Sequence, residues 1–230
     1  MKRKENVLFS IIVPVYNLEK YISICLDSLY NQGLDMSLYE VIVVNDGSDD
    51  NTLNIVNQYK MRYPNLKVLS QENAGVSVAR NRGIVDSSGE YVLFVDGDDR
   101  IEPYSLDKIY ELIKKYGKEI DIWVLRSFLE SGQERYSWLS YGIKDHSLFQ
   151  GMDFYRLRYN RGSVCGGLYK RELLISNDIR FPVGVKNGED SIFFSLVRMN
   201  AKNIFFADIC FYHVFERPGS ASRSMSIERV

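Results

Sequence analysis

Residues 90–99, EYVLFVDGDD, join a short apolar run to an acidic turn, and this junction points to both the fold and the chemistry. The run at residues 90–96 has the length and apolar character of a buried strand. Alternate side chains of an extended segment point the same way, so Asp96 and Asp98 can face one ion, and Gly97 lets the backbone bend close to it. Hard cations such as Mg²⁺ and Mn²⁺ prefer oxygen ligands, and Mg²⁺ is typically held by one or two carboxylates plus substrate phosphates. The turn therefore predicts a divalent-metal site shared with a diphosphate, with a solvated acidic turn as the simpler alternative.

Strand and helix signals alternate on both sides of this stretch. Apolar runs predict further strands at residues 9–15, 40–45, 66–70, 120–125 and 204–213. Helical periodicity and turn signals predict helices at residues 19–32, 53–59, 74–85 and from Pro103 to Ile113. Strands that alternate with helices form a mostly parallel sheet covered on both faces, so the predicted fold class is α/β.

The second half of the chain is less regular. Residues 150–158, 170–176 and 190–199 have helical patterns, whereas residues 127–149 are polar, aromatic-rich and weakly periodic, which predicts a loop or small excursion. No repeat, low-complexity segment or linker divides the chain. We therefore predict one domain over residues 1–230, with a nucleotide-binding half at about 8–100 and an acceptor-side half at about 101–230.

Polar residues follow each of the first four predicted strands. Asn17 follows the first strand, Asp46 the second, Asn73 the third and Asp96 the fourth. Ligands of parallel sheets bind beyond the carboxyl ends of the strands, so these side chains are expected to converge on one edge. Taken singly, each cluster also fits a structural role, such as a strand-ending turn or a helix cap.

Other charged segments suit a phosphate-binding site. Residues 73–83, NAGVSVARNRG, run from a loop into a helix whose start favours anions, and Arg80 adds a planar cation. Glu189 and Asp190 precede an apolar helix. They either interact with the dipole of that helix, or one of them is the general base of a reaction. His213 lies at the end of the late strand, where it is either a structural residue or a ligand. Residues 217–222, RPGSAS, are predicted to form a basic loop suited to folding over a diphosphate.

The composition argues against several classes of protein. Lys and Arg number 29 against 30 Asp and Glu, a formal net charge of −1 that lacks the basic excess of a nucleic-acid binder. No stretch approaches the roughly 18 apolar residues that span a bilayer. Cys25, Cys165 and Cys210 form no CxxC pair, so neither a zinc site nor a disulfide framework is indicated. A reducing, cytoplasmic setting is expected.

Five motifs taken together resemble the inverting glycosyltransferases of family 2. The motifs are FSIIVPVYN, VVNDGSDD, ENAGVSVARNRG, FVDGDD and NGEDSIFF, and the resemblance covers roughly residues 9–224. It implies the GT-A fold, a Rossmann-like sheet with helices on both faces. It also implies transfer of a hexosyl or N-acetylhexosaminyl group from a nucleotide sugar, usually a UDP-sugar, to a saccharide or lipid-linked acceptor. Surface polysaccharide assembly is the setting that the family suggests.

The resemblance also implies roles for individual residues. Asp46 would pair with the base, Asp98 would hold Mn²⁺ or Mg²⁺ with His213 as a third ligand, and Asp190 would be the catalytic base. The other residues that it places around the donor are Pro14, Tyr16, Asn17, Glu19, Gly47, Ser48, Asn73, Gly75, Arg80, Asp96, Gly97, Arg217 and Ser220.

Two other classes of protein stay open at this point. A nucleotidyltransferase would usually carry a glycine-rich, basic loop after the first strand, where this chain has residues 14–17, PVYN. A non-catalytic sugar-nucleotide-binding module would be indicated by loss of the DGDD or GED acids, which are present. Residues 127–166 match no motif, so the acceptor is not specified, and the family often carries further C-terminal segments. The basic start at residues 1–4 suggests peripheral contact with the inner face of a membrane.

Overall fold

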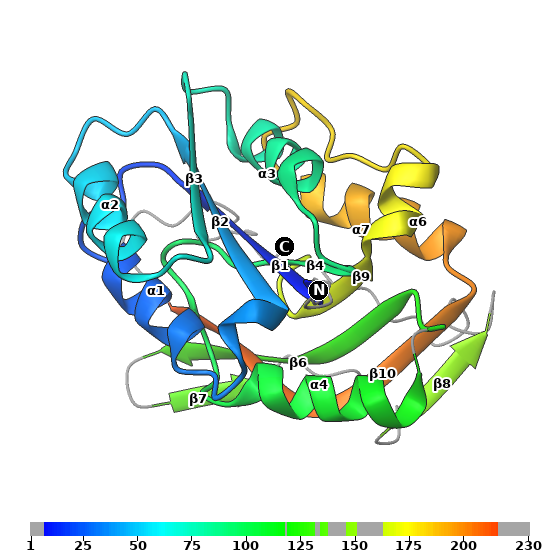
Figure 1. The fold of residues 1–230 in the computed structure, drawn as a ribbon. Coiled ribbons are helices and arrows are strands. Elements are labelled where there is room, and N and C mark those ends of the chain that lie inside the picture. Colours follow the sequence, from blue (N-terminus) through cyan, green and yellow to red (C-terminus); the bar gives the residue numbers. More distant parts are fainter. Residues whose placement is uncertain (1–6, 118, 132–133, 138–145, 151–162, 216–230) are drawn as a thin grey trace, which may run out of the picture.

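The fold is described from a computed structural model, which covers residues 7–117, 119–131, 134–137, 146–150 and 163–215 (Figure 1). Within these residues one ten-stranded sheet has the order β3-β2-β1-β4-β9-β6-β10-β5, with β7 paired to β6 and β8 to β10. Its strands are β1 (Phe9–Val15), β2 (Tyr39–Asp46), β3 (Leu66–Gln71), β4 (Tyr91–Phe94), β5 (Arg100–Ile101), β6 (Ile122–Ser131), β7 (Glu134–Ser137), β8 (Ser147–Gln150), β9 (Gly167–Lys170) and β10 (Asn203–Phe215).

The half of the sheet that contains β1 to β4 is entirely parallel. Strand β1 pairs with β2 and β4, and β2 pairs with β3. Every residue of β1 and β2 is buried, as expected where helices cover both faces of a parallel sheet. The carboxyl ends of these strands therefore share one edge, and the predicted α/β class is confirmed.

The other half of the sheet is mixed, and the sequence did not indicate all of it. Strand β9 is antiparallel to β4 and β6, while β10 is parallel to β6 and antiparallel to β5 and β8. The loop predicted for residues 127–149 is wrong in part, because β6 continues to Ser131 and β7 and β8 follow it. Polar residues of β6 such as Glu130 have partners on β5 and β10, so the strand lacks the apolar run that marks the others. Most of the helix predicted at 150–158 lies outside the described residues, and Gln150 itself ends β8.

Helices cover both faces of the sheet (Figure 1). They are α1 (Ile22–Tyr30), α2 (Thr52–Arg62), α3 (Val76–Asp86), α4 (Ser105–Tyr116), α6 (Arg171–Ser176) and α7 (Glu189–Asn200), with a 3₁₀ turn η1 (Met36–Leu38). Helices α1 and α2 lie on one side, and α3, α6 and α7 lie on the other. Helix α3 comes so close to β1 that a Cβ on Gly83 would stand 2.4 Å from Ile12 Cγ2, which requires glycine there. No helix in the described parts of the chain has the length and apolar character needed to cross a bilayer.

Candidate active site

A pocket of about 720 Å³ opens where β1, β2 and β4 end. Asp46, Asn73 and Asp96 all line it, so three of the four side chains expected at this edge converge there. Ten residues predicted from the sequence line the pocket: Pro14, Tyr16, Asp46, Asn73, Gly75, Arg80, Asp96, Gly97, Asp98 and Asp190.

Asp46 fixes the loop after β3, which borders this pocket. Its Oδ1 accepts hydrogen bonds from Gln71 Nε2 at 2.8 Å and from the amide of Ala74 at 2.9 Å. Its Oδ2 accepts one from the amide of Gly75 at 2.8 Å. A carboxylate offers about four acceptor positions. These contacts therefore leave about one position of the buried Asp46 for a ligand N–H or hydroxyl.

Four predicted donor residues are not among the residues that line the pocket: Asn17, Glu19, Gly47 and Ser48. Three of them join the loop after β1 to the loop after β2. The amide of Asn17 donates to Ser48 Oγ at 3.1 Å, and Asn17 Oδ1 accepts from the amide of Asp49 at 2.9 Å. Glu19 Oε2 accepts from the amide of Asn51 at 3.1 Å. These contacts hold residues 17–19 in a turn, so α1 begins at Ile22 rather than at the predicted Glu19.

Arg80 connects the acidic turn after β4 to the acids at the start of α7. Its Nη2 donates to Asp96 Oδ1 at 2.8 Å and its Nη1 donates to Asp190 Oδ1 at 2.6 Å. Glu189 lies further away, 3.7 Å from Nη1. The guanidinium is buried and stands over the Phe181 ring, 5.1 Å from its centroid. One cation thus holds two carboxylates that are 94 residues apart in the sequence, and both line the pocket.

The burial of this bridge changes how its acids titrate. Burial raises the pKa of Asp190 to about 6, although Arg80 and the amide of Val164, which donates to Oδ2 at 3.1 Å, act in the opposite direction. Burial alone would lower the pKa of Arg80, but Asp96 and Asp190 outweigh it and raise that pKa. Asp190 is therefore an acid that is ionised above neutrality and can take up a proton under mildly acidic conditions.

The last acid of the DGDD turn has a different role from the other two. Burial, and then the charges of Asp96 and Asp98, raise the pKa of Asp99 to about 8. Its Oδ2 accepts from the Tyr212 hydroxyl at 2.7 Å, and its Oδ1 accepts from the amide of Phe215 at 2.9 Å. Asp99 thus holds the end of β10 against the turn, and all three acids line the pocket.

The sequence profile described as Glycosyl transferase family 2 matches residues 10–174, which is more than half of the chain. The chain belongs to glycosyl transferase family 2. The matched segment contains all of the pocket residues contributed by β1 to β4 and by α3.

Similar proteins include two bacterial glycosyltransferases. The poly(ribitol-phosphate) beta-glucosyltransferase of Bacillus spizizenii is 36% identical over 91% of this chain and 32% of its own length. The cholesterol galactosyltransferase of Borreliella burgdorferi is 30% identical over 95% of this chain and 63% of its own length. The family 2 chain thus spans less than two thirds of these relatives.

A solved structure supports the fold assignment. The crystal structure of residues 1–349 of TarS from Staphylococcus aureus, in complex with UDP-GlcNAc, superposes with a TM-score of 0.84 at 32% identity. The superposition covers 95% of this chain and 61% of that chain. The GT-A fold expected from the sequence motifs is confirmed by this match.

The pocket also contains residues that the motifs did not single out. Lys186 lines it beside the acids of α7, and Ser163 and Phe215 line it from other segments. Asn187 also lines it; it begins the motif NGEDSIFF, but no role was predicted for it. Proximity to this motif could have indicated Lys186. Phe215 is the last residue of β10 and Ser163 lies in the segment before β9, and neither position carried such a signal.

Three predicted residues remain outside this arrangement. His213 is not among the residues that line the pocket, and its ring contacts Glu102 and Glu130 instead. That position gives no support to an ion shared by His213 and Asp98. Arg217 and Ser220 lie outside the described residues.

Proposed function

We propose that this family 2 chain is an inverting glycosyltransferase that moves a sugar from a UDP-sugar to a hydroxyl of a saccharide or lipid-linked acceptor, in surface polysaccharide synthesis at the cytoplasmic side of the membrane. The Asp96–Arg80–Asp190 bridge carries the proposal, because it joins a donor-side acid and a candidate base across one pocket. Membership of family 2 favours this activity over a nucleotidyltransferase. An assay of sugar transfer distinguishes this activity from that of a non-catalytic binding module, which would bind the nucleotide sugar without transferring the sugar.

Asp190 is the proposed general base. A sugar hydroxyl is a weak acid, so a carboxylate must take its proton as the new glycosidic bond forms. Arg80 and the amide of Val164 orient the Asp190 carboxylate toward the pocket from two sides. A single displacement inverts the anomeric centre, since the attacking hydroxyl and the leaving diphosphate occupy opposite faces of the sugar.

The acidic turn suits a divalent metal. Asp96 and Asp98 both line the pocket and offer the carboxylate oxygens that Mn²⁺ and Mg²⁺ prefer. Gly97 brings the turn close to β1, where a Cβ would stand 2.8 Å from Leu18 Cδ1 and Val15 Cγ1. Asp98 would hold the ion with Asp96 beside it, and the bound ion would neutralise charge on the leaving diphosphate. Lys186 supplies a further cation to the pocket, and Arg217 and Ser220 are proposed to close over the diphosphate.

Metal-dependent binding of UDP tests the donor site. We expect calorimetric titration to show UDP binding with Mn²⁺, at least about tenfold weaker binding without Mn²⁺, and a similar loss in Asp98→Ala, because the ion links carboxylate and phosphate. GDP should bind more weakly than UDP. Asp86→Ala removes an exposed acid from the end of α3 and serves as the matched control. Unchanged UDP binding in Asp98→Ala would refute the assignment, and so would a wild-type chain that binds neither nucleotide.

The pKa of Asp190 predicts the pH dependence of transfer. A base works only when deprotonated, so a pKa of about 6 means that kcat/KM should rise about tenfold per pH unit below pH 6 and level off above pH 7. Initial rates measured from pH 5 to pH 8 with saturating Mn²⁺ give this profile. A rate that falls or stays constant between pH 5 and pH 7 would exclude Asp190 as the group that limits the reaction.

The acceptor is the least constrained part of the proposal. The relatives are named for acceptors as different as poly(ribitol phosphate) and cholesterol, although both match more than nine tenths of this chain. Donor and acceptor must therefore be identified together. A radiolabelled UDP-sugar screen against poly(ribitol phosphate), free oligosaccharides and lipid-linked saccharides does this, and hydrolysis without transfer to any class would count against the proposal.

A further inference from the structure

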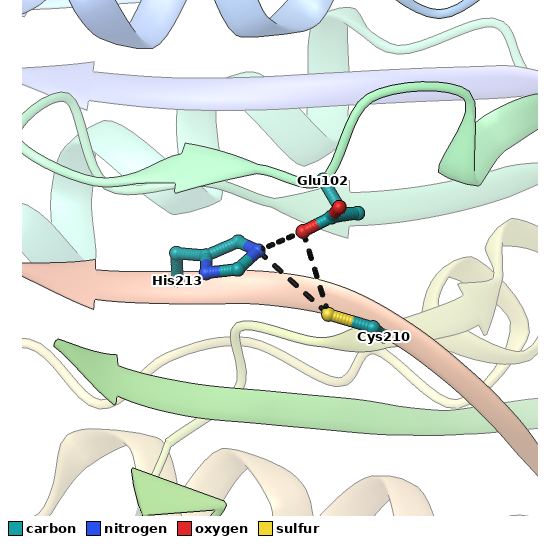
Figure 2. A group of neighbouring side chains, drawn as sticks. All are labelled: Glu102, Cys210 and His213. Atoms are coloured by element: carbon teal, nitrogen blue, oxygen red, sulfur yellow. Dashed lines mark hydrogen bonds and ion pairs between the residues drawn. The ribbon is translucent and has the colours of Figure 1, made fainter. Parts of the chain in front are cut away.

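A second cluster of metal-binding side chains lies away from the donor pocket. Glu102 follows β5, and Cys210 and His213 lie on β10 (Figure 2). Cys210 Sγ is 3.7 Å from His213 Nε2 and 3.5 Å from Glu102 Oε2, and Nε2 is 2.5 Å from the same carboxylate oxygen. Sulfur, imidazole nitrogen and carboxylate oxygen are the three ligand types that zinc accepts in proteins. None of these three residues lines the donor pocket.

The backbone of β10 is shaped to bring two of these ligands to one side. Residues three apart on a regular strand point to opposite faces, so Cys210 and His213 would normally diverge. The pairing of β10 with β6 shifts register on both sides of Cys210, between Phe206 and Cys210 and between Cys210 and Tyr212. Such an irregularity re-aims a side chain, and here it turns Cys210 toward His213.

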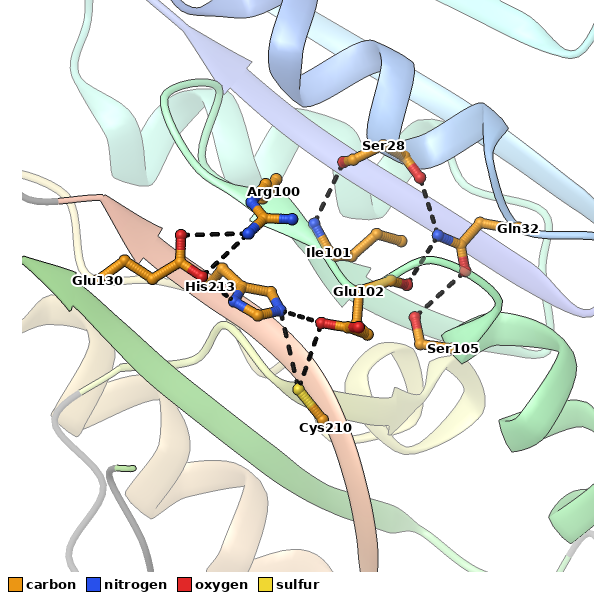
Figure 3. A network of polar contacts seen from close by, with 9 residues as sticks. All are labelled: Ser28, Gln32, Arg100, Ile101, Glu102, Ser105, Glu130, Cys210 and His213. Carbon is orange, nitrogen blue, oxygen red and sulfur yellow. Dashed lines mark hydrogen bonds and ion pairs between the residues drawn. The ribbon is translucent and has the colours of Figure 1, made fainter. Parts of the chain in front are cut away.

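The far side of His213 has the surroundings of a metal-bound histidine (Figure 3). Its Nδ1 lies 2.7 Å from Glu130 Oε1, and Arg100 Nη2 donates to the same carboxylate at 2.9 and 3.2 Å. A histidine that binds a metal through one nitrogen usually donates the other N–H to a carboxylate, which fixes the ring and its tautomer. With the proton on Nδ1, the Nε2 lone pair faces Cys210 and Glu102.

The distances allow a tetrahedral ion with a small adjustment. Ligands of tetrahedral zinc stand roughly 3.3–3.7 Å apart, and both contacts of Cys210 Sγ are close to this range. The contact between Glu102 and His213 would lengthen by about 0.8 Å, and the Glu102 side chain is 32% exposed and can move outward. A thiolate and the Glu102 carboxylate would balance the charge of Zn²⁺, while Arg100 balances Glu130.

We propose that Glu102, Cys210 and His213 bind a zinc ion, with water as the fourth ligand. The ion ties β10 to the segment between β5 and α4. The same stretch of β10 carries Tyr212, whose hydroxyl holds Asp99 and accepts from the amide of Asp96 at 3.1 Å. Zinc would therefore stabilise the strand that supports the acidic turn, while Asp98 on the pocket side offers only hard oxygen ligands. Without a metal, a protonated His213 between two carboxylates would keep the same contacts, and metal titration separates these two states.

Cobalt titration tests the site directly. The full chain, stripped of metal by a chelator and carrying Asp98→Ala to weaken the donor site, is titrated with Co²⁺ as a coloured substitute for Zn²⁺. We expect one equivalent to give thiolate-to-cobalt charge-transfer absorption that Zn²⁺ then abolishes. Cys210→Ser should lose this absorption, and Glu130→Gln should weaken cobalt binding about 10–100-fold. Zinc should raise the thermal unfolding midpoint of the parent chain, which carries Asp98→Ala alone, and leave the midpoint of the chain with the added Cys210→Ser unchanged.

Cys165→Ser is the matched control, because the Cys165 thiol lies 3.7 Å from the carboxylate of Asp96, which is proposed to lie beside the donor metal. It should keep the charge-transfer band. A parent chain without this band, or a band that survives in Cys210→Ser and disappears in Cys165→Ser, overturns the proposal. If Cys210→Ser does not fold, the presence or absence of the charge-transfer band in the parent chain and in Cys165→Ser still tests the proposal.

Discussion

Asp190→Asn is expected to lower kcat for sugar transfer by about 10²–10⁴-fold while leaving the affinity for UDP within about twofold of wild type. Asparagine keeps the size of the side chain and can still accept a hydrogen bond from Arg80, but it cannot take a proton from the acceptor hydroxyl. UDP does not require a proton acceptor in order to bind. Kinetics with a UDP-sugar and calorimetry with UDP on the same preparation measure the two effects separately.

Glu189→Gln is the control for this prediction. It removes a charge of the same sign from the neighbouring residue, which also lines the pocket and lies 3.7 Å from Arg80. We expect it to reduce kcat far less than Asp190→Asn does. If instead Glu189→Gln abolishes transfer and Asp190→Asn does not, the base is Glu189. If both retain near wild-type rates, no acid at the start of α7 is the base.

The apolar pattern of the sequence predicted the parallel half of the sheet, β1 to β4. Strands β1 and β2 are largely apolar runs because helices cover both their faces. The acidic turn was predicted at the ligand-binding edge because it directly follows such a strand. The part of β6 beyond Leu125 was not predicted, because it contains polar residues such as Glu130 and so lacks an apolar run. Glu130 has partners on neighbouring strands, Arg100 on β5 and His213 on β10, that the sequence does not reveal. Strand β9 has only four residues, too few for a periodic signal.

The candidate site was predictable as a list of residues but not as an arrangement. Motif positions indicated Arg80, Asp96 and Asp190 separately, yet nothing in the sequence says that one guanidinium holds both acids. Asn17 and Glu19 show the opposite case, since they sit where a ligand is expected and instead contact the loop after β2. Contacts between distant segments decide which polar residues face the ligand and which hold the loops that surround it.

Arg80→Met is expected to destabilise the protein by about 3–5 kcal/mol, because it leaves the carboxylates of Asp96 and Asp190 in a largely buried site without their shared cation. Methionine keeps a long apolar side chain against Phe181, so the loss reports mainly on charge. Urea unfolding at pH 7 measures the change. Arg82→Met is the control: its guanidinium donates to the carbonyl oxygen of Ser70 near the surface, and we expect a cost below about 1 kcal/mol.

The destabilisation by Arg80→Met should also shrink as pH falls. Without Arg80 the folded-state pKa of Asp190 should rise above the value of about 6 that it has beside the cation, whereas unfolding returns it to its ordinary range near 4. Between these two values the folded chain binds more protons than the unfolded chain, so the stability of the variant increases as pH is lowered from 7 toward 5. The variant should therefore recover part of its lost stability near pH 5, and Arg80→Met combined with Asp190→Asn should recover part of it at pH 7. A cost below about 1 kcal/mol that does not change with pH would mean that water, rather than Arg80, compensates these two acids.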